Sequence, residues 1–359
     1  MDASVIVTYR CPMRCVMCNI WANPTAVQEE FKPELLVKLP HVALANVTGG
    51  EPFIREDLEE IIGILFTKTK RIVISTSGWY EDRVIALARK FPRLGFRVSI
   101  EGLSQKNDEL RGHAGGFDKG LRVLLELRRM GIRDLGFGIT VSNNNSADML
   151  GLYELSRNLK MQFATAAFHN SFYFHKDDNV ITNVDQVCAH FEELANRLMR
   201  ENHPKSWLRA LFNIGLVNYI RGQRRMLPCE AGSENFFVDP WGEILPCNGM
   251  EAKYWRESMG NLHEVTRFEE LWNSPRAAEV REKVANCPKC CWMIGSASPV
   301  IRKYARALVP WVVTNKLKVA MGGRLRADQC PHFEVGQNPA QGSLADHPES
   351  DLVQISESR

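Results

Sequence analysis

Three cysteines near the start of the chain have the spacing of an iron–sulfur cluster site. Cys11, Cys15 and Cys18 lie on one short loop that follows an apolar run. Iron–sulfur clusters usually take four Cys thiolates, so a loop with three leaves one iron of a cubane for a ligand that the protein does not supply. A zinc knuckle would need a fourth ligand close by, and the next Cys or His along the chain is His41. The spacing therefore favours a cluster with one open iron.

A second set of cysteines lies in the last third of the chain. Cys287 and Cys290 form a C-x2-C pair, a spacing that lets two thiolates share one metal site. Cys229 and Cys247 precede the pair, and the segment between them predicts a hairpin because two apolar runs flank a turn of Asp, Pro and Gly. These four thiols could hold a cluster or a structural zinc ion. Cys291 is adjacent to Cys290 and could replace it as a ligand.

Composition and charge narrow the class of protein. Of the 359 residues, 45% are hydrophobic and 24% charged, which is ordinary for a globular protein. The formal net charge of +3 is too small to indicate nucleic acid as a partner. We recognise no cleavable signal region and no apolar run near the length of a membrane span. We therefore expect a cytoplasmic protein whose thiols stay reduced and bind metal.

The first half of the chain alternates between short β-branched runs and longer amphipathic stretches. This pattern predicts parallel strands connected by helices that cover both faces of the sheet. We expect strands at 5–9, 42–48, 71–75, 96–100, 137–141 and 162–166 and helices at 58–66, 82–90, 119–130 and 147–160. Six such units predict an α/β fold, a partial (β/α)6 barrel of the TIM type. Its functional groups should lie on the loops that follow the strands.

The loop after the second predicted strand reads Gly49-Gly50-Glu51. Glycines have no Cβ, so their backbone can approach a ligand closely, and the Glu51 carboxylate can accept hydrogen bonds from an ammonium group. Together with the C-x3-C-x2-C loop, this motif resembles the radical S-adenosylmethionine (SAM) superfamily. The resemblance implies that the three cysteines hold a [4Fe–4S] cluster, that SAM fills the open iron site and that the Gly-Gly-Glu motif grips the methionine amine.

Other positions match the family with departures. The residue before the third cysteine, often aromatic in the family, is Met17, and the usual Asn-Gly after strand three is Ser77-Gly78. The usual Ser-x-Asp-Gly after strand four has Glu101 in place of Asp. Each of these polar residues could equally serve its own turn. By resemblance, the candidate SAM contacts are Met17, Gly49, Gly50, Glu51, Ser75, Ser77, Ser99, Arg111, Thr140, Ser142 and Asn144.

The order C-x12-G-x4-C followed by C-x2-C resembles the auxiliary-cluster extension called SPASM, in its shorter single-cluster "twitch" form. The longer form needs further cysteines soon after the C-x2-C pair, where only Cys291 and the distant Cys330 remain. The resemblance implies a second, auxiliary [4Fe–4S] cluster. Its expected ligands are Cys229, Cys247, Cys287 and Cys290.

The two resemblances together imply an enzyme that cleaves SAM reductively to a 5′-deoxyadenosyl radical. This radical would take hydrogen from a small molecule, for which we considered a sugar or a lipid-linked sugar. An auxiliary cluster with four thiolates has no open iron but can accept an electron, which favours a net oxidation of the dehydrogenase type. The electron donor would be a flavodoxin or ferredoxin.

Three alternatives remain open at this stage. An epimerase would need a thiol as hydrogen donor, for which Cys330 and Cys291 are the candidates; the catalytic residues are otherwise unknown. Peptide maturation is common among relatives. A protein of another class, a non-catalytic iron–sulfur or zinc scaffold or an electron carrier, would have no need of a SAM-binding motif.

The C-terminal segment 299–326 carries seven basic residues and no acidic one. Its apolar residues form two helical patterns that we expect to break at Pro310. Such a segment predicts contact with a membrane surface or an anionic lipid-linked substrate, unless its apolar face packs on the barrel. The expected divisions of the chain are a radical SAM core at 1–182, a helical linker at 183–226, an auxiliary-cluster domain at 227–298, basic amphipathic helices at 299–326 and a partly disordered tail at 327–359.

Overall fold

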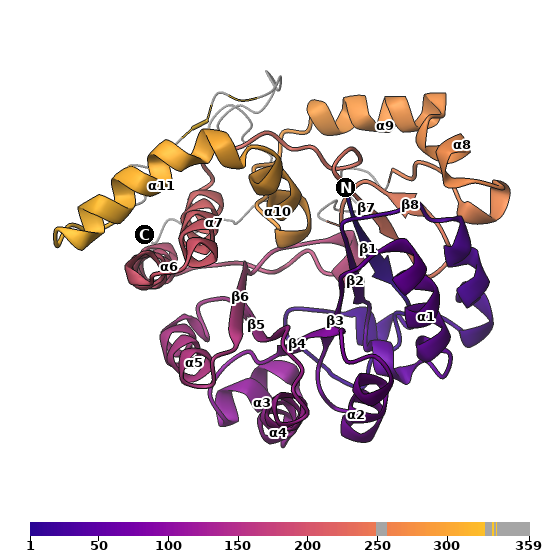
Figure 1. The fold of residues 1–359 in the computed structure, drawn as a ribbon, viewed down its shortest axis with the longest axis horizontal. Helices are drawn as coiled ribbons and strands as arrows, with labels where there is room; N and C mark the ends of the chain where they lie inside the picture. Colours follow the sequence, from indigo (N-terminus) through magenta and orange to yellow (C-terminus); the bar gives the residue numbers. More distant parts are fainter. Residues whose placement is uncertain (249–256, 327–331, 334, 336–359) are drawn as a thin grey trace.

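The computed structural model describes residues 1–248, 257–326, 332–333 and 335. At the centre of this part of the chain is one sheet in the order β6-β5-β4-β3-β2-β1-β7-β8 (Figure 1). Its strands are β1 (Asp2–Ile6), β2 (Leu44–Thr48), β3 (Ile72–Thr76), β4 (Gly95–Ser99), β5 (Leu135–Val141), β6 (Gln162–Ala167), β7 (Asn235–Val238) and β8 (Ile244–Leu245).

The pairing of the strands confirms the predicted α/β fold with a partial barrel. Strands β1 to β6 pair in parallel in chain order. The predicted hairpin is formed by β7 and β8, which pair antiparallel. Strand β7 also pairs in parallel with β1, so that Asp2 lies opposite Asn235 and Val5 opposite Val238. The hairpin of the auxiliary segment therefore extends the barrel sheet.

Helices cover the outer face of the barrel and continue beyond it (Figure 1). Helices α6 and α7 pack against each other, and α11 packs against both. The helices are α1 (Leu58–Lys68), α2 (Glu81–Lys90), α3 (Gln105–Arg111), α4 (Gly116–Arg129), α5 (Ser146–Asn158), α6 (Val184–Arg200), α7 (Pro204–Ile220), α8 (Phe268–Trp272), α9 (Pro275–Ala285), α10 (Ile294–Lys303) and α11 (Ala305–Ala320). None of the described helices is long and apolar enough to cross a membrane.

Side chains on strands β2 to β6 alternate between two environments, as the period of a strand requires. The fully buried ones are apolar and form the core beneath the helices. The partly exposed ones in between are small or polar and line the inside of the barrel, where Ser75 Oγ lies 3.2 Å from Asn46 Oδ1 on the next strand. The lining side chains include Asn46, Thr48, Ser75, Ser99 and Thr140. This wall can offer hydrogen bonds to a ligand.

A polar network lies at the opposite end of these strands. Arg97 on β4 forms an ion pair of 2.6 Å with Asp134, just before β5. The same guanidinium donates to Gln162 Oε1 at the start of β6, at 2.9 Å, and Arg209 of α7 donates to that oxygen at 2.5 Å. The network ties together the amino-terminal ends of neighbouring strands, so the ligand-binding end is the opposite one, where the strands finish.

Helix α11 departs from the prediction that the chain breaks at Pro310. The break comes earlier, at Tyr304, which ends α10 and caps α11, and Pro310 lies inside α11. Proline removes one backbone hydrogen bond and leaves the carbonyl of residue i−4 without its partner. Here the ring lies on the exposed side of the helix, where water can satisfy that carbonyl, so the helix continues.

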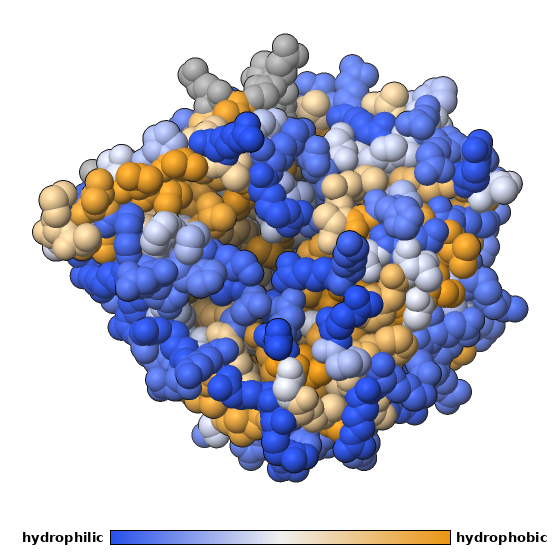
Figure 2. All heavy atoms as spheres, in the orientation of Figure 1, coloured by the Kyte–Doolittle hydropathy of each residue, from blue (hydrophilic) through white to orange (hydrophobic). Residues whose placement is uncertain are grey.

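Helix α11 has an apolar side chain on both of its faces. Leu308, Val312 and Val319 are buried against the body of the protein. At steps of four residues, a second stripe faces outward. It consists of Val309, Val313, Leu317 and Met321, which are 54%, 49%, 57% and 82% exposed. Figure 2 shows this apolar surface along α11.

Candidate active site

The first three cysteines lie on the loop beyond the end of β1, and each is partly buried. Burial raises the pKa of the Cys11 and Cys18 thiols to about 12, and the neighbouring Cys15 raises both further. Burial likewise raises the pKa of Cys15. The three thiols are therefore close enough to influence one another, in surroundings where a thiolate needs the positive charge of a metal to form.

The donor set fits a cluster better than a single ion. Within the described residues, no three Cys, His, Asp or Glu side chains converge as the ligands of one metal ion do. The cysteines of a cubane cluster bind different irons and therefore point at different corners. Soft thiolates held apart on one loop are what such a cluster requires.

The cysteine loop rests on the end of α3, which the sequence did not predict. Arg14 N donates to Arg111 O at 3.0 Å and Val16 N donates to Leu110 O at 2.9 Å. Gly112 follows with φ of +64°, and a Cβ there would lie 2.5 Å from Arg14 O. A glycine is needed at this contact for its conformation and for the lack of space.

The glycine motif also packs on the cysteine loop. Gly50 N donates to Thr8 O at 2.8 Å and Glu51 N donates to Arg10 O at 2.9 Å. A Cβ on Gly49 would overlap Thr8 O, and one on Gly50 would overlap Arg10 O. The glycines therefore bring this backbone against the segment just before the cysteines, a role that adds to the ligand approach we predicted.

The Glu51 carboxylate is fully buried and accepts hydrogen bonds from the end of β3. Thr76 Oγ1 donates at 2.7 Å, Ser77 N at 2.7 Å and Ser77 Oγ at 2.5 Å. Phe53 N adds a fourth bond of 3.3 Å. Each carboxylate oxygen accepts about two bonds, so a direct contact with the SAM ammonium requires one of these to be released. That contact stays a prediction, and Ser77 is found serving Glu51.

A buried ion pair lies beside the cysteine loop at the ends of β4 and β5. Arg111 Nη1 lies 3.4 Å from Glu101 Oε1, and Glu101 Oε2 accepts a bond of 2.6 Å from Thr140 N. Asn145 Nδ2 donates to the carbonyl oxygens of Glu101 and Thr140 at 2.7 and 2.9 Å. Burial raises the pKa of Glu101, which Arg111 opposes. Arg111, the predicted SAM carboxylate partner, is thus already held beside the cluster loop by Glu101.

The remaining predicted SAM contacts differ in how open they are. Ser99 and Thr140 are partly exposed inside the barrel. Ser142 is buried, where its N–H donates to Asn145 Oδ1 at 2.7 Å and its Oγ accepts from Asn144 N at 3.2 Å. Ser142 and Asn144 therefore build the turn that opens α5, and their contact with a ribose stays a prediction.

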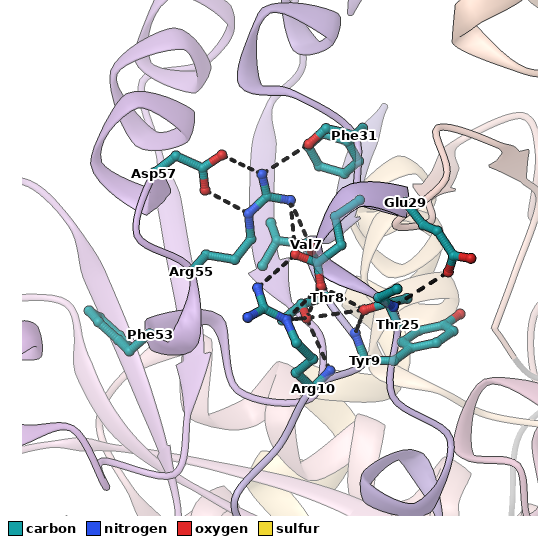
Figure 3. A network of polar contacts seen from close by, with 12 residues as sticks. Val7, Thr8, Tyr9, Arg10, Thr25, Glu29, Phe31, Phe53, Arg55 and Asp57 are labelled. Atoms are coloured by element: carbon teal, nitrogen blue, oxygen red, sulfur yellow. Dashed lines mark hydrogen bonds and ion pairs between the residues drawn. The ribbon is translucent and has the colours of Figure 1, made fainter.

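A polar network that the sequence did not suggest fixes the segment on both sides of the cysteine loop (Figure 3). The buried Glu30 carboxylate lies 2.7 Å from Arg10 Nη2 and accepts a bond of 2.6 Å from Thr25 Oγ1. Arg55, after the glycine motif, donates to the carbonyl oxygens of Val7 and Phe31 at 2.9 Å each. Four segments far apart in sequence are joined here, so the loop's position depends on charged side chains at both ends.

The loop after β6 covers the cysteine loop. Tyr173 Oη donates to Gly49 O at 2.9 Å, and Asn19 N donates to Phe174 O at 2.8 Å. Cys11 and Cys18 pack against an apolar cluster that includes Tyr173 of this loop and Phe237 of the auxiliary hairpin. The cover excludes water from the thiols and brings the auxiliary segment to the same end of the barrel.

The auxiliary cysteines gather around one of the residues that the sequence left open. Burial raises the pKa of Cys287 to about 12, and its thiol is influenced next by Cys291 and Cys229. Burial also raises the pKa of Cys291, to which Cys229 again contributes. Burial raises the pKa of Cys290 to about 11, and Cys291 is its only thiol neighbour among the described residues that influence it. Cys229, Cys287 and Cys291 are therefore mutual neighbours, and Cys290 is peripheral to them.

The other cysteines have simpler places. Cys188 is buried in α6, as expected of a structural cysteine. Cys247 follows β8, and the structure describes it among the partly buried cysteines. Cys330, a candidate hydrogen donor, lies outside the described residues, as does most of the predicted tail at 327–359.

Comparison with known proteins agrees with this geometry. The family model named Radical SAM superfamily matches residues 5–155, and the SPASM model, an iron–sulfur cluster-binding domain, matches residues 229–292. Fe-coproporphyrin III synthase of Methanosarcina barkeri is 32% identical over 326 residues, covering 80% of this chain and 79% of that protein. The chain belongs to the radical SAM superfamily and carries a SPASM domain.

Other radical SAM relatives are more distant. AdoMet-dependent heme synthase of Oleidesulfovibrio alaskensis is 25% identical, covering 74% of this chain and 72% of that protein. The subtilosin biosynthesis protein AlbA of Bacillus subtilis is 23% identical, covering 77% of this chain and 60% of that protein. The family implies SAM and [4Fe–4S] clusters as cofactors, and the two sets of thiols fit them.

Solved structures share the fold at low identity. The peptide-bound anSMEcpe structure with AdoMet has a TM-score of 0.56 at 13% identity and covers 89% of this chain and 100% of that chain. SuiB of Streptococcus suis with S-adenosylmethionine has a TM-score of 0.59 at 14% identity and covers 78% of this chain and 67% of that chain. These matches support the barrel with its extension.

Proposed function

We propose that this radical SAM enzyme acts on an iron tetrapyrrole with carboxylate side chains and oxidises it by two electrons in all. The observation that carries the proposal is the 32% identity over most of both chains to a protein named Fe-coproporphyrin III synthase. Proteins named heme synthase and pre-heme d1 synthase are also similar. None of the relatives named here has a sugar in its name, so the tetrapyrrole replaces the sugar that we first considered.

The residues of the chain have a clear division of work in this reaction. When bound, the first cluster and SAM supply a 5′-deoxyadenosyl radical that takes hydrogen from the substrate. Cys11, Cys15 and Cys18 would hold that cluster, and the glycine motif with the barrel wall would position SAM. The loop after β6 covers the thiols and would keep water and oxidants away.

The surroundings of the auxiliary cysteines favour an electron acceptor. Arg225 donates to Cys291 O, its Nη2 is buried with no partner, and its charge acts on both Cys290 and Cys291. Lys289 adds a second positive charge beside Cys287. Reduction makes a cluster more negative, and nearby cations stabilise that state and raise the reduction potential. This environment supports a net oxidation over an epimerisation.

Peptide maturation is a second candidate. AlbA and the mycofactocin maturase MftC are similar to this chain, and one neighbouring structure holds a peptide. The two substrates can be told apart by their effect on SAM cleavage.

The test is SAM cleavage by anaerobically reconstituted, dithionite-reduced protein. We expect iron coproporphyrin III to stimulate formation of 5′-deoxyadenosine and to be converted to a product of different mass. The variant with Cys11, Cys15 and Cys18 replaced by Ala is the control and should form none. Cleavage that responds to a peptide and to no tetrapyrrole would overturn the proposal. A flavodoxin or ferredoxin as the natural reductant stays a prediction.

We also propose that the outward stripe of α11 contacts an anionic membrane surface. Arg306 shares the face of the stripe, and no acidic residue occurs at 299–326. Four of the seven basic side chains already have partners in the protein. These are Arg302 with Asp2, Lys303 with Glu230, Arg324 with Glu193, and Lys316 with the carbonyl oxygens of Met199, Arg200 and Glu201 at the end of α6. The apolar stripe therefore supports the contact more than the number of charges does.

A further inference from the structure

His169, two residues beyond β6, has a buried ring nitrogen without a partner. Its Nδ1 lies 2.8 Å from Ala167 O, and because a carbonyl oxygen can only accept, Nδ1 carries the hydrogen. Nε2 is buried and has no hydrogen-bond partner among the described residues. An unsatisfied buried polar atom costs about 1–3 kcal/mol, so it calls for an explanation such as a ligand.

The position of His169 is between the two sets of cysteines. One amide nitrogen, Asn179 Nδ2, donates to His169 O at 2.8 Å and to Met17 O at 3.1 Å, so His169 is tied to the residue before Cys18. On the other side, the charge of Lys289, within the C-x2-C pair, acts on His169. Asn179 Oδ1 is a second buried polar atom here without a partner. A substrate that lies between the radical source and the auxiliary site would therefore meet His169.

The imidazole is in the form that can bind a metal. Burial lowers the pKa of His169, and the Lys289 ammonium lowers it further, so the ring is neutral at pH 7. Histidines that bind metals usually donate their other N–H to a carbonyl or a carboxylate, which fixes the ring and makes the free nitrogen more basic. The bond from Nδ1 to Ala167 O is such a contact.

Aromatic side chains surround this histidine. The ring of Phe174 lies 5.0 Å from the imidazole, between centroids, and Phe168 and Phe172 are partly exposed nearby in the chain. Flat apolar rings suit the face of an aromatic macrocycle. Because Nε2 is covered, the packed side chains, Phe174 among them, must turn aside when a ligand enters.

We propose that Nε2 of His169 binds the iron of the tetrapyrrole substrate as an axial ligand. This inference rests on the proposed function, because it takes the substrate to be an iron tetrapyrrole. The bond forms between the Nε2 lone pair and the substrate iron, and no electron or proton is transferred. It orients the macrocycle between the two clusters and gives the unpartnered nitrogen its partner.

The test compares two probes, iron(III) coproporphyrin III and metal-free coproporphyrin III, added to the full reconstituted chain. We expect the wild-type protein to shift the Soret band and the spin state of the iron probe. His169→Ala should weaken binding of the iron probe by about tenfold or more and leave binding of the metal-free probe unchanged. Added imidazole should restore the wild-type spectrum. His190→Ala is the matched control, since His190 in α6 also has a buried, unpartnered ring nitrogen.

A second measurement needs no variant. Pulsed electron paramagnetic resonance of the wild-type complex should show a nitrogen coupling that changes when the protein carries isotopically labelled histidine. Equal loss of both probes in His169→Ala, or a wild-type spectrum without histidine coupling, would overturn the ligation while leaving the tetrapyrrole substrate in place. Failure of the wild-type protein to bind either probe would overturn the proposed function as well.

Discussion

The Glu51 carboxylate shows what a motif residue can do besides meeting a ligand. Its oxygens hold Thr76 and Ser77, so Glu51→Ala leaves buried donors unsatisfied as well as altering the SAM site. We expect the free energy of unfolding to fall by about 1–3 kcal/mol, measured by chemical denaturation, together with weaker SAM binding by calorimetry. Glu56→Ala, at an exposed position of the same segment, is the control. Unchanged stability would mean that Thr76 and Ser77 find other partners.

The choice between Cys290 and Cys291 can be tested with two serine variants. Because Cys291 is the neighbour of both Cys229 and Cys287, we expect Cys291→Ser to lose the auxiliary cluster and Cys290→Ser to keep it. Wild-type protein should hold about eight irons and Cys291→Ser about four, by iron analysis and Mössbauer spectroscopy. Loss of iron in Cys290→Ser alone would restore the ligand that the C-x2-C spacing predicted, and a zinc atom in wild-type protein would refute an auxiliary cluster.

Among the elements, α7 depends on a glycine for its contact with the auxiliary segment. A Cβ on Gly215 would overlap the indole of Trp292, which is almost fully buried and donates to Phe212 O at 3.0 Å. Gly→Ala within a helix normally stabilises a protein, but here overpacking should reverse the sign. We expect Gly215→Ala to destabilise by about 1–3 kcal/mol, and Gly63→Ala in α1, where no atom lies within 4 Å of the new Cβ, to stabilise. A denaturation series of the two variants tests this; equal effects would contradict the close contact.

The outward stripe of α11 is the second feature at this scale. If it enters the interface of a membrane, a charge within it should prevent binding. We expect the wild-type chain to co-sediment with anionic liposomes at low salt and the double variant Val313→Glu, Leu317→Glu to stay in the supernatant. Leu125→Glu changes an exposed apolar residue of α4 and should leave binding intact. If wild-type protein does not bind, or the double variant binds equally, the stripe has another purpose.

For the whole molecule, the sequence predicted what depends on local pattern. The alternation of β-branched runs and amphipathic stretches predicted all six barrel strands, and the cysteine spacings predicted the two metal sites. The network of Glu30 with Arg10 and Arg55 could not be predicted, because it depends on how the segment between the first two strands folds back. The unpartnered nitrogen of His169 is likewise visible only once neighbouring loops are in place, since a histidine in a loop gives no signal by itself.

The place of β1 inside the sheet decides which parts of the chain can exist alone. β1 has β2 on one side and β7 on the other, and all five of its residues are buried. A fragment ending at 228 contains the whole stretch that matches the radical SAM model but lacks β7. Its first strand becomes an apolar edge with unpaired N–H and C=O groups, which recruits other copies. We expect this fragment to elute as aggregate from a sizing column and the full chain as a discrete species. The auxiliary hairpin is then also a guard against self-association, required whether or not any cluster is bound.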